Sequence, residues 1–141
     1  MHNEYSCGAI VYRINKQRLE YLIVQEMQDY HGFPKGHVEL NETAIETAIR
    51  EVKEETGLDI KIIDDFKEID AYYVEPIDAY KEVTYFVAKS PKQALILQAC
   101  EIKTAAFYDL QTSLKMIERA SSREILIKAD NYLKAKYQLN F

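Results

Sequence analysis

The segment that most constrains the fold of this chain is residues 36–58, GHVELNETAIETAIREVKEETGL. Apolar residues recur at helical spacing between positions 45 and 52, which predicts a helix over 43–56. Asn41 is the predicted N-cap, and Gly57 is the predicted C-terminal stop. The preceding stretch, 29–37, contains two glycines and a proline and is predicted to be a loop. The chain therefore enters a short amphipathic helix directly from an irregular segment.

Three glutamates of this helix stand close together. Glu51, Glu54 and Glu55 fall within about one turn and, at about 100° per residue, share one face beside the apolar stripe. Like charges at this spacing destabilise a helix by roughly 0.2–0.5 kcal/mol per pair. An acidic helix face in water would produce the same cluster. A hard divalent cation is the alternative, because Mg²⁺ prefers oxygen ligands and commonly bridges carboxylates to substrate phosphates.

The rest of the chain alternates strands and helices. Strands are predicted where short runs are rich in β-branched, aliphatic and aromatic residues, at 6–13, 19–26, 58–66, 67–74, 81–89 and 104–110. Helical spacing returns from residue 111, in two pieces that divide near 121–122. The 141 residues fit one domain. This order predicts an α/β or α+β sandwich, a mixed sheet with the first helix on one face and the C-terminal helices elsewhere.

Composition restricts the partners. The net charge of −5 argues against a polyanion-binding surface, so no DNA partner is expected. Cys7 and Cys100 form no CxxC motif, which is typical of reduced thiols, and we expect a cytoplasmic protein. No apolar run approaches the roughly 18 residues that a membrane span requires, and the N-terminus does not have the pattern of a secretory signal. The oligomeric state is not predicted.

Residues 36–58 carry a family pattern. They match G-x5-E-x7-R-E-U-x-E-E-x-G-U, with U aliphatic, at every specified position, from Gly36 and Glu42 through Arg50 to Leu58. This pattern is the Nudix box, and the chain therefore resembles a Nudix hydrolase domain spanning residues 1–141. The resemblance implies the Nudix α/β/α sandwich with a mixed β-sheet.

The resemblance also implies a reaction. Nudix enzymes hydrolyse a nucleoside diphosphate linked to another group, with Mg²⁺ or Mn²⁺ and attack by water at phosphorus. It assigns metal binding to Glu51, Glu54, Glu55 and the backbone carbonyl of Lys35. A glutamate of the cluster acts as general base, and which one is left open.

Around these ligands the resemblance implies supporting roles. Arg50 orients a glutamate, Glu42 supports that ion-pair network, and Gly57 ends the helix. The same logic follows from chemistry, because hydrolysis of a phosphoanhydride needs neutralised oxygens and a positioned water. Carboxylates on a rigid helix hold such a site in place.

Flanking segments are similar to one Nudix subfamily, the asymmetrical diadenosine tetraphosphate hydrolases. The similar segments are CGAIVYR at 7–13, FPKGHVE at 33–39 and KEVTYFVAK at 81–89. This likeness implies substrate-binding roles for Lys35, Gly36, His37, Lys81, Tyr85 and Tyr132. Tyr85 would stack on a purine, Tyr132 would offer a second aromatic ring, and the basic side chains would contact the polyphosphate. In EIKTAAFYDL, the likeness makes Glu101 a further metal ligand or base.

Two other functions remain open at this point. A nucleoside triphosphate or RNA 5′-end pyrophosphohydrolase would use the same box, although RNA processing favours a basic surface around the site. A non-catalytic nucleotide sensor is the third hypothesis, but such domains typically lose box residues. Two stacking aromatics on opposite sides of the cleft favour a dinucleotide, and one favours a simple nucleotide.

Overall fold

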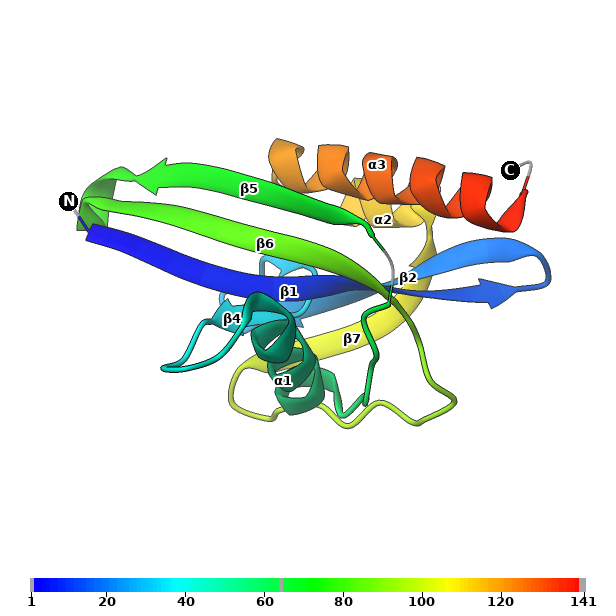
Figure 1. The fold of residues 1–141 in the computed structure, drawn as a ribbon, viewed down its shortest axis with the longest axis horizontal. Helices are drawn as coiled ribbons and strands as arrows, with labels where there is room; N and C mark the ends of the chain where they lie inside the picture. Colours follow the sequence, from blue (N-terminus) through cyan, green and yellow to red (C-terminus); the bar gives the residue numbers. More distant parts are fainter. Residues whose placement is uncertain (1, 64, 140–141) are drawn as a thin grey trace.

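The computed structural model describes residues 2–63 and 65–139 (Figure 1). Its elements, in chain order, are β1 (His2–Asn15), β2 (Arg18–Glu26), β3 (His31–Gly32), β4 (Lys35–His37), α1 (Ala44–Thr56), β5 (Lys67–Val74), a 3₁₀ helix (Glu75–Ile77), β6 (Ala79–Lys89), β7 (Ile102–Asp109), α2 (Leu110–Met116) and α3 (Ala120–Tyr137). In this part of the chain, no helix is both long enough and apolar enough to cross a membrane.

The strands of the described residues form one seven-stranded mixed sheet. Its main order is β3-β2-β1-β6-β5, with β4 added to β1 and β7 added to β2. The β1–β6 pair is parallel, and the other pairs are antiparallel. The long strand β1 is the centre of this arrangement, because it pairs with β2, β4 and β6.

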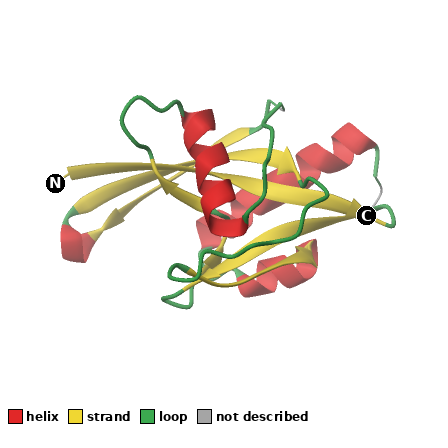
Figure 2. Cartoon of the chain, turned by 90° about the horizontal axis from the view of Figure 1, so that it is seen from below, coloured by secondary structure: helices red, strands yellow, loops and turns green. Residues whose placement is uncertain are grey.

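Alternation along β1 supplies both faces of the sheet. Ala9 and Val11 pack in a cluster with Val52 of α1, whereas Ile10 and Tyr12 pack in another cluster with Leu126 of α3. Successive side chains of a strand point to opposite faces, so one buried strand serves two layers. In Figure 2 the sheet lies between α1 in front and the C-terminal helices behind. The predicted α/β/α sandwich with a mixed sheet, in a single domain, is confirmed.

The ends of α1 follow local rules. Gly57 adopts φ +79° and donates its backbone N–H to Lys53 O, so it is the predicted C-terminal stop. The predicted N-cap is wrong, because Thr43 caps the helix through a reciprocal capping box with Glu46. Asn41 instead takes a left-handed conformation, φ +68°, in the turn before the helix. Asparagine tolerates that region better than most residues.

Three local predictions also need correction. The described residues of 58–66 form no strand, and residue 64 lies outside the described residues; Leu58, Ile60 and Phe66 are buried by packing rather than by strand pairing. The predicted loop 29–37 contains β3 and β4. The C-terminal helices divide at 117–119 rather than near 121–122. For β3 and β4, pairing with β2 and β1 decides what the local pattern left ambiguous.

Candidate active site

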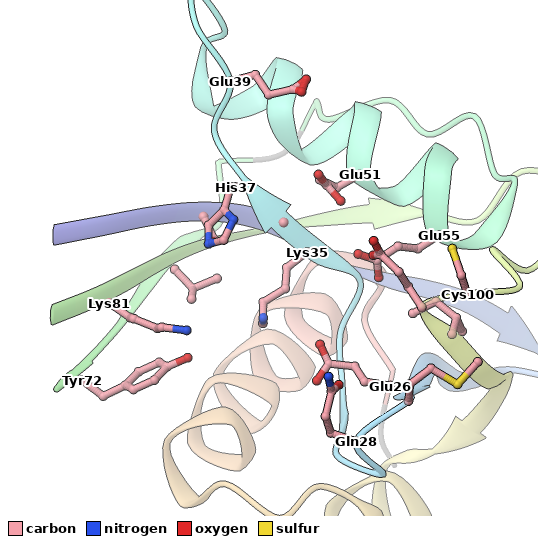
Figure 3. Close-up of a pocket in the computed structure, with 16 residues that line it drawn as sticks. Glu26, Gln28, Lys35, His37, Glu39, Glu51, Glu55, Tyr72, Lys81 and Cys100 are labelled. Carbon is pink, nitrogen blue, oxygen red and sulfur yellow. The ribbon is translucent and has the colours of Figure 1, made fainter. Parts of the chain in front are cut away.

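A cleft of about 510 Å³ opens where β4 and α1 meet the start of β7 (Figure 3). We call it the carboxylate lobe, because five glutamates line it: Glu26, Glu39, Glu51, Glu55 and Glu101. Glu51 and Glu55 come from α1, Glu26 ends β2, and Glu101 immediately precedes β7. The sheet thus brings together carboxylates that lie up to 75 positions apart in the chain, from residue 26 to residue 101.

Close backbone contacts set the position of the loop against α1. A Cβ atom at Gly36 would overlap the carboxylate of Glu51, so only glycine leaves room for that side chain. A Cβ at Gly8 would overlap the carbonyl oxygen of Pro34 in the same way. These two glycines allow β4 to lie against β1 and place the backbone of Lys35 at the edge of the carboxylate lobe.

Arg50 organises the outer side of the site. Its guanidinium donates to Glu42 at 2.6 Å, to Glu51 at 2.8 Å and to Glu54 at 3.2 Å. It also donates to the backbone carbonyl of His37 at 2.9 Å, which ties α1 to the loop. These hydrogen bonds hold the pKa of Glu42 near 2, and the pKa of Arg50 is raised by the same contacts. The network predicted between Arg50, Glu42 and a cluster glutamate is present.

The three predicted glutamates differ in environment. Glu55 is only 6% exposed, and burial together with the charge of Glu51 raises the pKa of Glu55 to about 9. Glu54 lies on the outer side, where its carboxylate is held by Arg50 and its side chain is 45% exposed. Across residues 2–63 and 65–139, no three His, Cys, Asp or Glu side chains are gathered closely enough to hold a metal ion.

The carboxyl groups of this lobe are nevertheless suited to bind a divalent cation. Glu51 and Glu55 are two carboxyl groups held side by side with little water, and burial together with the charge of Glu51 raises the pKa of Glu55. Carboxylate oxygens are the donors that Mg²⁺ and Mn²⁺ take. Glu101 lines the same lobe, and Glu54 lies on the same helix as Glu51 and Glu55, with its carboxylate on Arg50.

Basic groups line the other side of the carboxylate lobe. Figure 3 shows Lys35 and Lys81 pointing into the cleft, with His37 nearby. Glu4 restrains two of these groups, at 3.3 Å from His37 Nε2 and at 3.7 Å from Lys81 Nζ. The structure therefore gathers the predicted residues Lys35, Gly36, His37 and Lys81 around one opening.

A second cavity of about 450 Å³ continues from the first. The two share Glu26, Lys35, Tyr72, Lys81 and Val83, so they are two ends of one elongated cleft. We call the second end the aromatic lobe, because its lining includes Tyr30, Phe33, Tyr72 and Tyr85, together with Asp70 and Arg119.

The structure contradicts the predicted stacking roles of Tyr85 and Tyr132. Tyr85 is 3% exposed and packs edge-on against Phe33, with ring centroids 5.4 Å apart, so it forms part of the floor and offers no open ring face. Tyr132 packs against Phe66 at 5.6 Å within the α3 side of the core and lines neither lobe. Tyrosine on a strand or amphipathic helix packs into cores as readily as into sites.

Sequence reasoning missed the residues that do line this lobe. Tyr72 stands opposite Lys81 in the β5–β6 pair, and Asp70 shares its face of β5. Period-two alternation in KEIDAYYV is a signal that places Asp70 and Tyr72 together. No local pattern marks Glu26 or Arg119, which tertiary contacts bring to the cleft.

Comparison with known proteins identifies the family of this chain. The NUDIX domain model matches residues 4–128. The chain belongs to the NUDIX family. Nudix hydrolases generally use divalent metal ions, which agrees with the carboxylate lobe.

Several curated proteins are similar to this Nudix chain over most of its length. It is 30% identical over 126 residues to bis(5′-nucleosyl)-tetraphosphatase [asymmetrical] from Sus scrofa, covering 82% of this chain and 74% of the relative. The Caenorhabditis elegans enzyme of that name is 27% identical over 133 residues, covering 91% and 95%. The family and these relatives make this chain a Nudix pyrophosphohydrolase.

Solved structures agree with the fold of this Nudix hydrolase. A C. elegans Ap4A hydrolase binary complex superposes with a TM-score of 0.86 at 26% identity, covering 94% of this chain and 98% of that one. The NUDIX domain of Shewanella oneidensis NrtR, crystallised with ADP ribose, gives a TM-score of 0.74 at 17% identity. The second likeness shows the shared fold alone.

Proposed function

We propose that this Nudix hydrolase cleaves diadenosine tetraphosphate asymmetrically, giving ATP and AMP, with Mg²⁺ as its cofactor and Mn²⁺ as a substitute. One observation carries the proposal: the cleft has two lobes joined by a basic stretch. A dinucleoside polyphosphate has the same arrangement, with a polyphosphate between two nucleosides. The relatives from Sus scrofa and C. elegans are bis(5′-nucleosyl)-tetraphosphatases [asymmetrical], which supports this substrate class.

Glu51, Glu54, Glu55, Glu101 and the carbonyl oxygen of Lys35 are the proposed holders of the metal. When bound, it neutralises charge on phosphate oxygens and lowers the pKa of a coordinated water. The burial of Glu55 and its closeness to Glu51 support their share in this role. The hold of Arg50 on both Glu51 and Glu54 supports its role in orienting these carboxylates.

The chain's own residues position the reactants. The ammonium groups of Lys35 and Lys81, with His37, bind the negative phosphate oxygens across the middle of the cleft. A water molecule attacks one phosphorus atom, the P–O bond of the anhydride breaks, and the leaving phosphate takes the electron pair. A carboxylate of the cluster, from Glu51, Glu54 or Glu101, accepts the proton of the water.

We further propose that the substrate is a small-molecule nucleotide and that the protein acts in the cytoplasm. The net charge of −5 is consistent with a pocket that binds a small anion rather than a nucleic acid.

Product analysis tests the proposed function. The purified protein with Mg²⁺ is incubated with an equimolar mixture of diadenosine tetraphosphate, nucleoside triphosphates and a nucleotide sugar, and the products are separated by chromatography. We expect ATP and AMP to appear first. Pyrophosphate from a triphosphate, with the dinucleotide untouched, would retain the carboxylate lobe as the site and reject the substrate.

A further inference from the structure

Arg119 occupies an unusual position in the aromatic lobe. It lies in the connection between α2 and α3, and its guanidinium carbon is 3.7 Å from the centroid of the Tyr72 ring. A planar guanidinium at this distance stacks on the ring and gains a cation–π contact.

A buried carboxylate holds the guanidinium in this place. Asp70 Oδ2 accepts from Arg119 Nη2 at 3.2 Å and from Ser121 Oγ at 3.0 Å, and the Asp70 side chain is only 4% exposed. Removing the partner of a buried charge is strongly destabilising. The arginine therefore does not leave Tyr72 easily, because Asp70 would lose its cation.

The outer face of the guanidinium remains available. The Arg119 side chain is 41% exposed although one face rests on Tyr72, and the residue lines the aromatic lobe. The floor beside it is apolar, built from Val24, Phe33, Val83 and Tyr85. A flat, weakly polar group that enters this lobe can therefore lie against the guanidinium plane of Arg119 and contact the apolar side chains of the floor.

We infer that Arg119 is the stacking partner of the second nucleobase and determines the base specificity of the aromatic lobe. The base lies on the outer face of the guanidinium, which gives a three-layer stack of Tyr72, Arg119 and base. This inference rests on the proposed function, because it assigns the second nucleoside of a dinucleotide to this lobe. Bases stack on arginine planes as well as on aromatic rings.

Asp70 is a positioning residue in this arrangement. Its side chain is only 4% exposed, and it acts by holding the guanidinium over the Tyr72 ring. A purine covers more of the guanidinium than a pyrimidine does, so the lobe selects purines. Replacing Arg119 by lysine keeps the charge and removes the plane, which separates stacking from simple electrostatic attraction.

The test compares Arg119→Lys with a matched control, Arg13→Lys. Arg13 also lies over a ring, 4.4 Å from the Phe107 centroid, and pairs with Glu20 at 2.7 Å, but it lines neither lobe. KM and kcat are measured for diadenosine and diuridine tetraphosphate. Separately, adenosine binding to each protein is measured by calorimetry in EDTA, which needs no turnover.

For Arg119→Lys we expect KM for the diadenosine substrate to rise about tenfold, in the range of base-stacking contributions. The kcat should stay within about twofold, the preference for adenine over uracil should fall, and adenosine should bind about tenfold more weakly. Arg119→Tyr restores a flat face and should recover most of the affinity. Asp70→Asn should change KM in the same direction by less. Arg13→Lys should match the wild type in every assay.

The two proposals fail in different ways. If diadenosine tetraphosphate is cleaved and Arg119→Lys keeps the wild-type KM and base preference, the inference on Arg119 is overturned and the proposed function stands. If the dinucleotide is not cleaved, the proposed function fails. The role of Arg119 in base stacking is then tested by calorimetry alone. Weaker adenosine binding by a folded Arg119→Lys protein then supports the inference, and equal binding overturns it. Thermal melting establishes that each variant is folded.

Discussion

The carboxylate lobe takes most of its charged groups from one stretch of chain, whereas the aromatic lobe is assembled from separate elements. Lys35, Gly36, His37, Glu51 and Glu55 fall within residues 35–55, on β4 and α1. The aromatic lobe combines β2, the segment that follows it, β5, β6 and the α2–α3 connection. A site built by one loop and one helix leaves a pattern in the sequence. A site built where distant elements meet does not.

The two lobes also differ in what holds their side chains. In the carboxylate lobe, like charges are brought together and Arg50 restrains them from the outer side. In the aromatic lobe, the one buried carboxylate has a cation of its own, since Asp70 pairs with Arg119. The buried carboxyl group with a strongly raised pKa, Glu55, thus lies in the lobe where we propose that the chemistry occurs, as is common for active sites.

The largest expected effect is at α1. Glu54→Gln and Glu55→Gln should each lower kcat by on the order of 10²–10³-fold, the scale seen when one group that stabilises transition-state charge is removed. Steady-state kinetics with the diadenosine substrate measure this. Glu124→Gln, an exposed glutamate of α3, is the control and should keep wild-type kinetics. Wild-type rates in both α1 variants would refute the assignment of the carboxylate lobe.

Glu55→Gln should lower kcat and at the same time raise the stability of the folded protein. Burial and the charge of Glu51 oppose ionisation of Glu55, so a neutral isostere removes a cost of folding. We expect its melting temperature in EDTA, at neutral pH, to rise by about 2–4 °C for each kcal/mol gained. A melting temperature equal to or below that of the wild type would show that Glu55 is already compensated.

Gly36→Ala should damage the carboxylate lobe without changing any charge. Its Cβ overlaps the Glu51 carboxylate, so the glutamate must move and kcat should fall by about 10–100-fold, as for lost orientation of a metal ligand. Gly32→Ala is the matched control for stability, because nothing lies within 4 Å of its added Cβ. If both variants melt alike and Gly36→Ala retains wild-type kcat, the close fit of loop and helix is not required.

Added Mg²⁺ should stabilise the protein through the carboxylate lobe and not through the aromatic lobe. Mg²⁺ at about 100 times its dissociation constant should stabilise the wild type by about 2.7 kcal/mol, because binding favours the folded state. Differential scanning calorimetry with Mg²⁺ and with EDTA measures the shift. Glu51→Gln should lose most of it, and Arg119→Lys should keep it. A full shift in Glu51→Gln would move the metal away from this lobe.

The smallest effect is expected at Tyr132. Tyr132→Phe keeps the ring that packs on Phe66, and the side chain lines neither lobe. We therefore expect KM for the diadenosine substrate to stay within about twofold of the wild type, because the variant alters no group that lines the cleft. A tenfold increase in KM would restore the role in base binding that the sequence pattern indicated.

Much of the carboxylate lobe was predictable because its signals are local. The box residues, the helix and its stop at Gly57 all depend on neighbours within a few positions. The strands 6–13, 19–26, 67–74 and 81–89 were also recognisable, since each is a dense run of strand-forming residues. The segment 58–66 misled for the same reason: its apolar residues are buried by packing while its backbone joins no strand.

The sequence by itself determined the family, the sandwich and the acidic helix, because periodicity and a 23-position motif act over short distances. Only the tertiary structure decided which aromatic rings meet the cleft. The register of β5 against β6 places Tyr72 beside Lys81, and the segment between β3 and β4 brings Phe33 against Tyr85. The connection after α2 then carries Arg119 onto Tyr72, across 46 intervening positions. Pairing register and helix packing are long-range properties, and no local pattern encodes them.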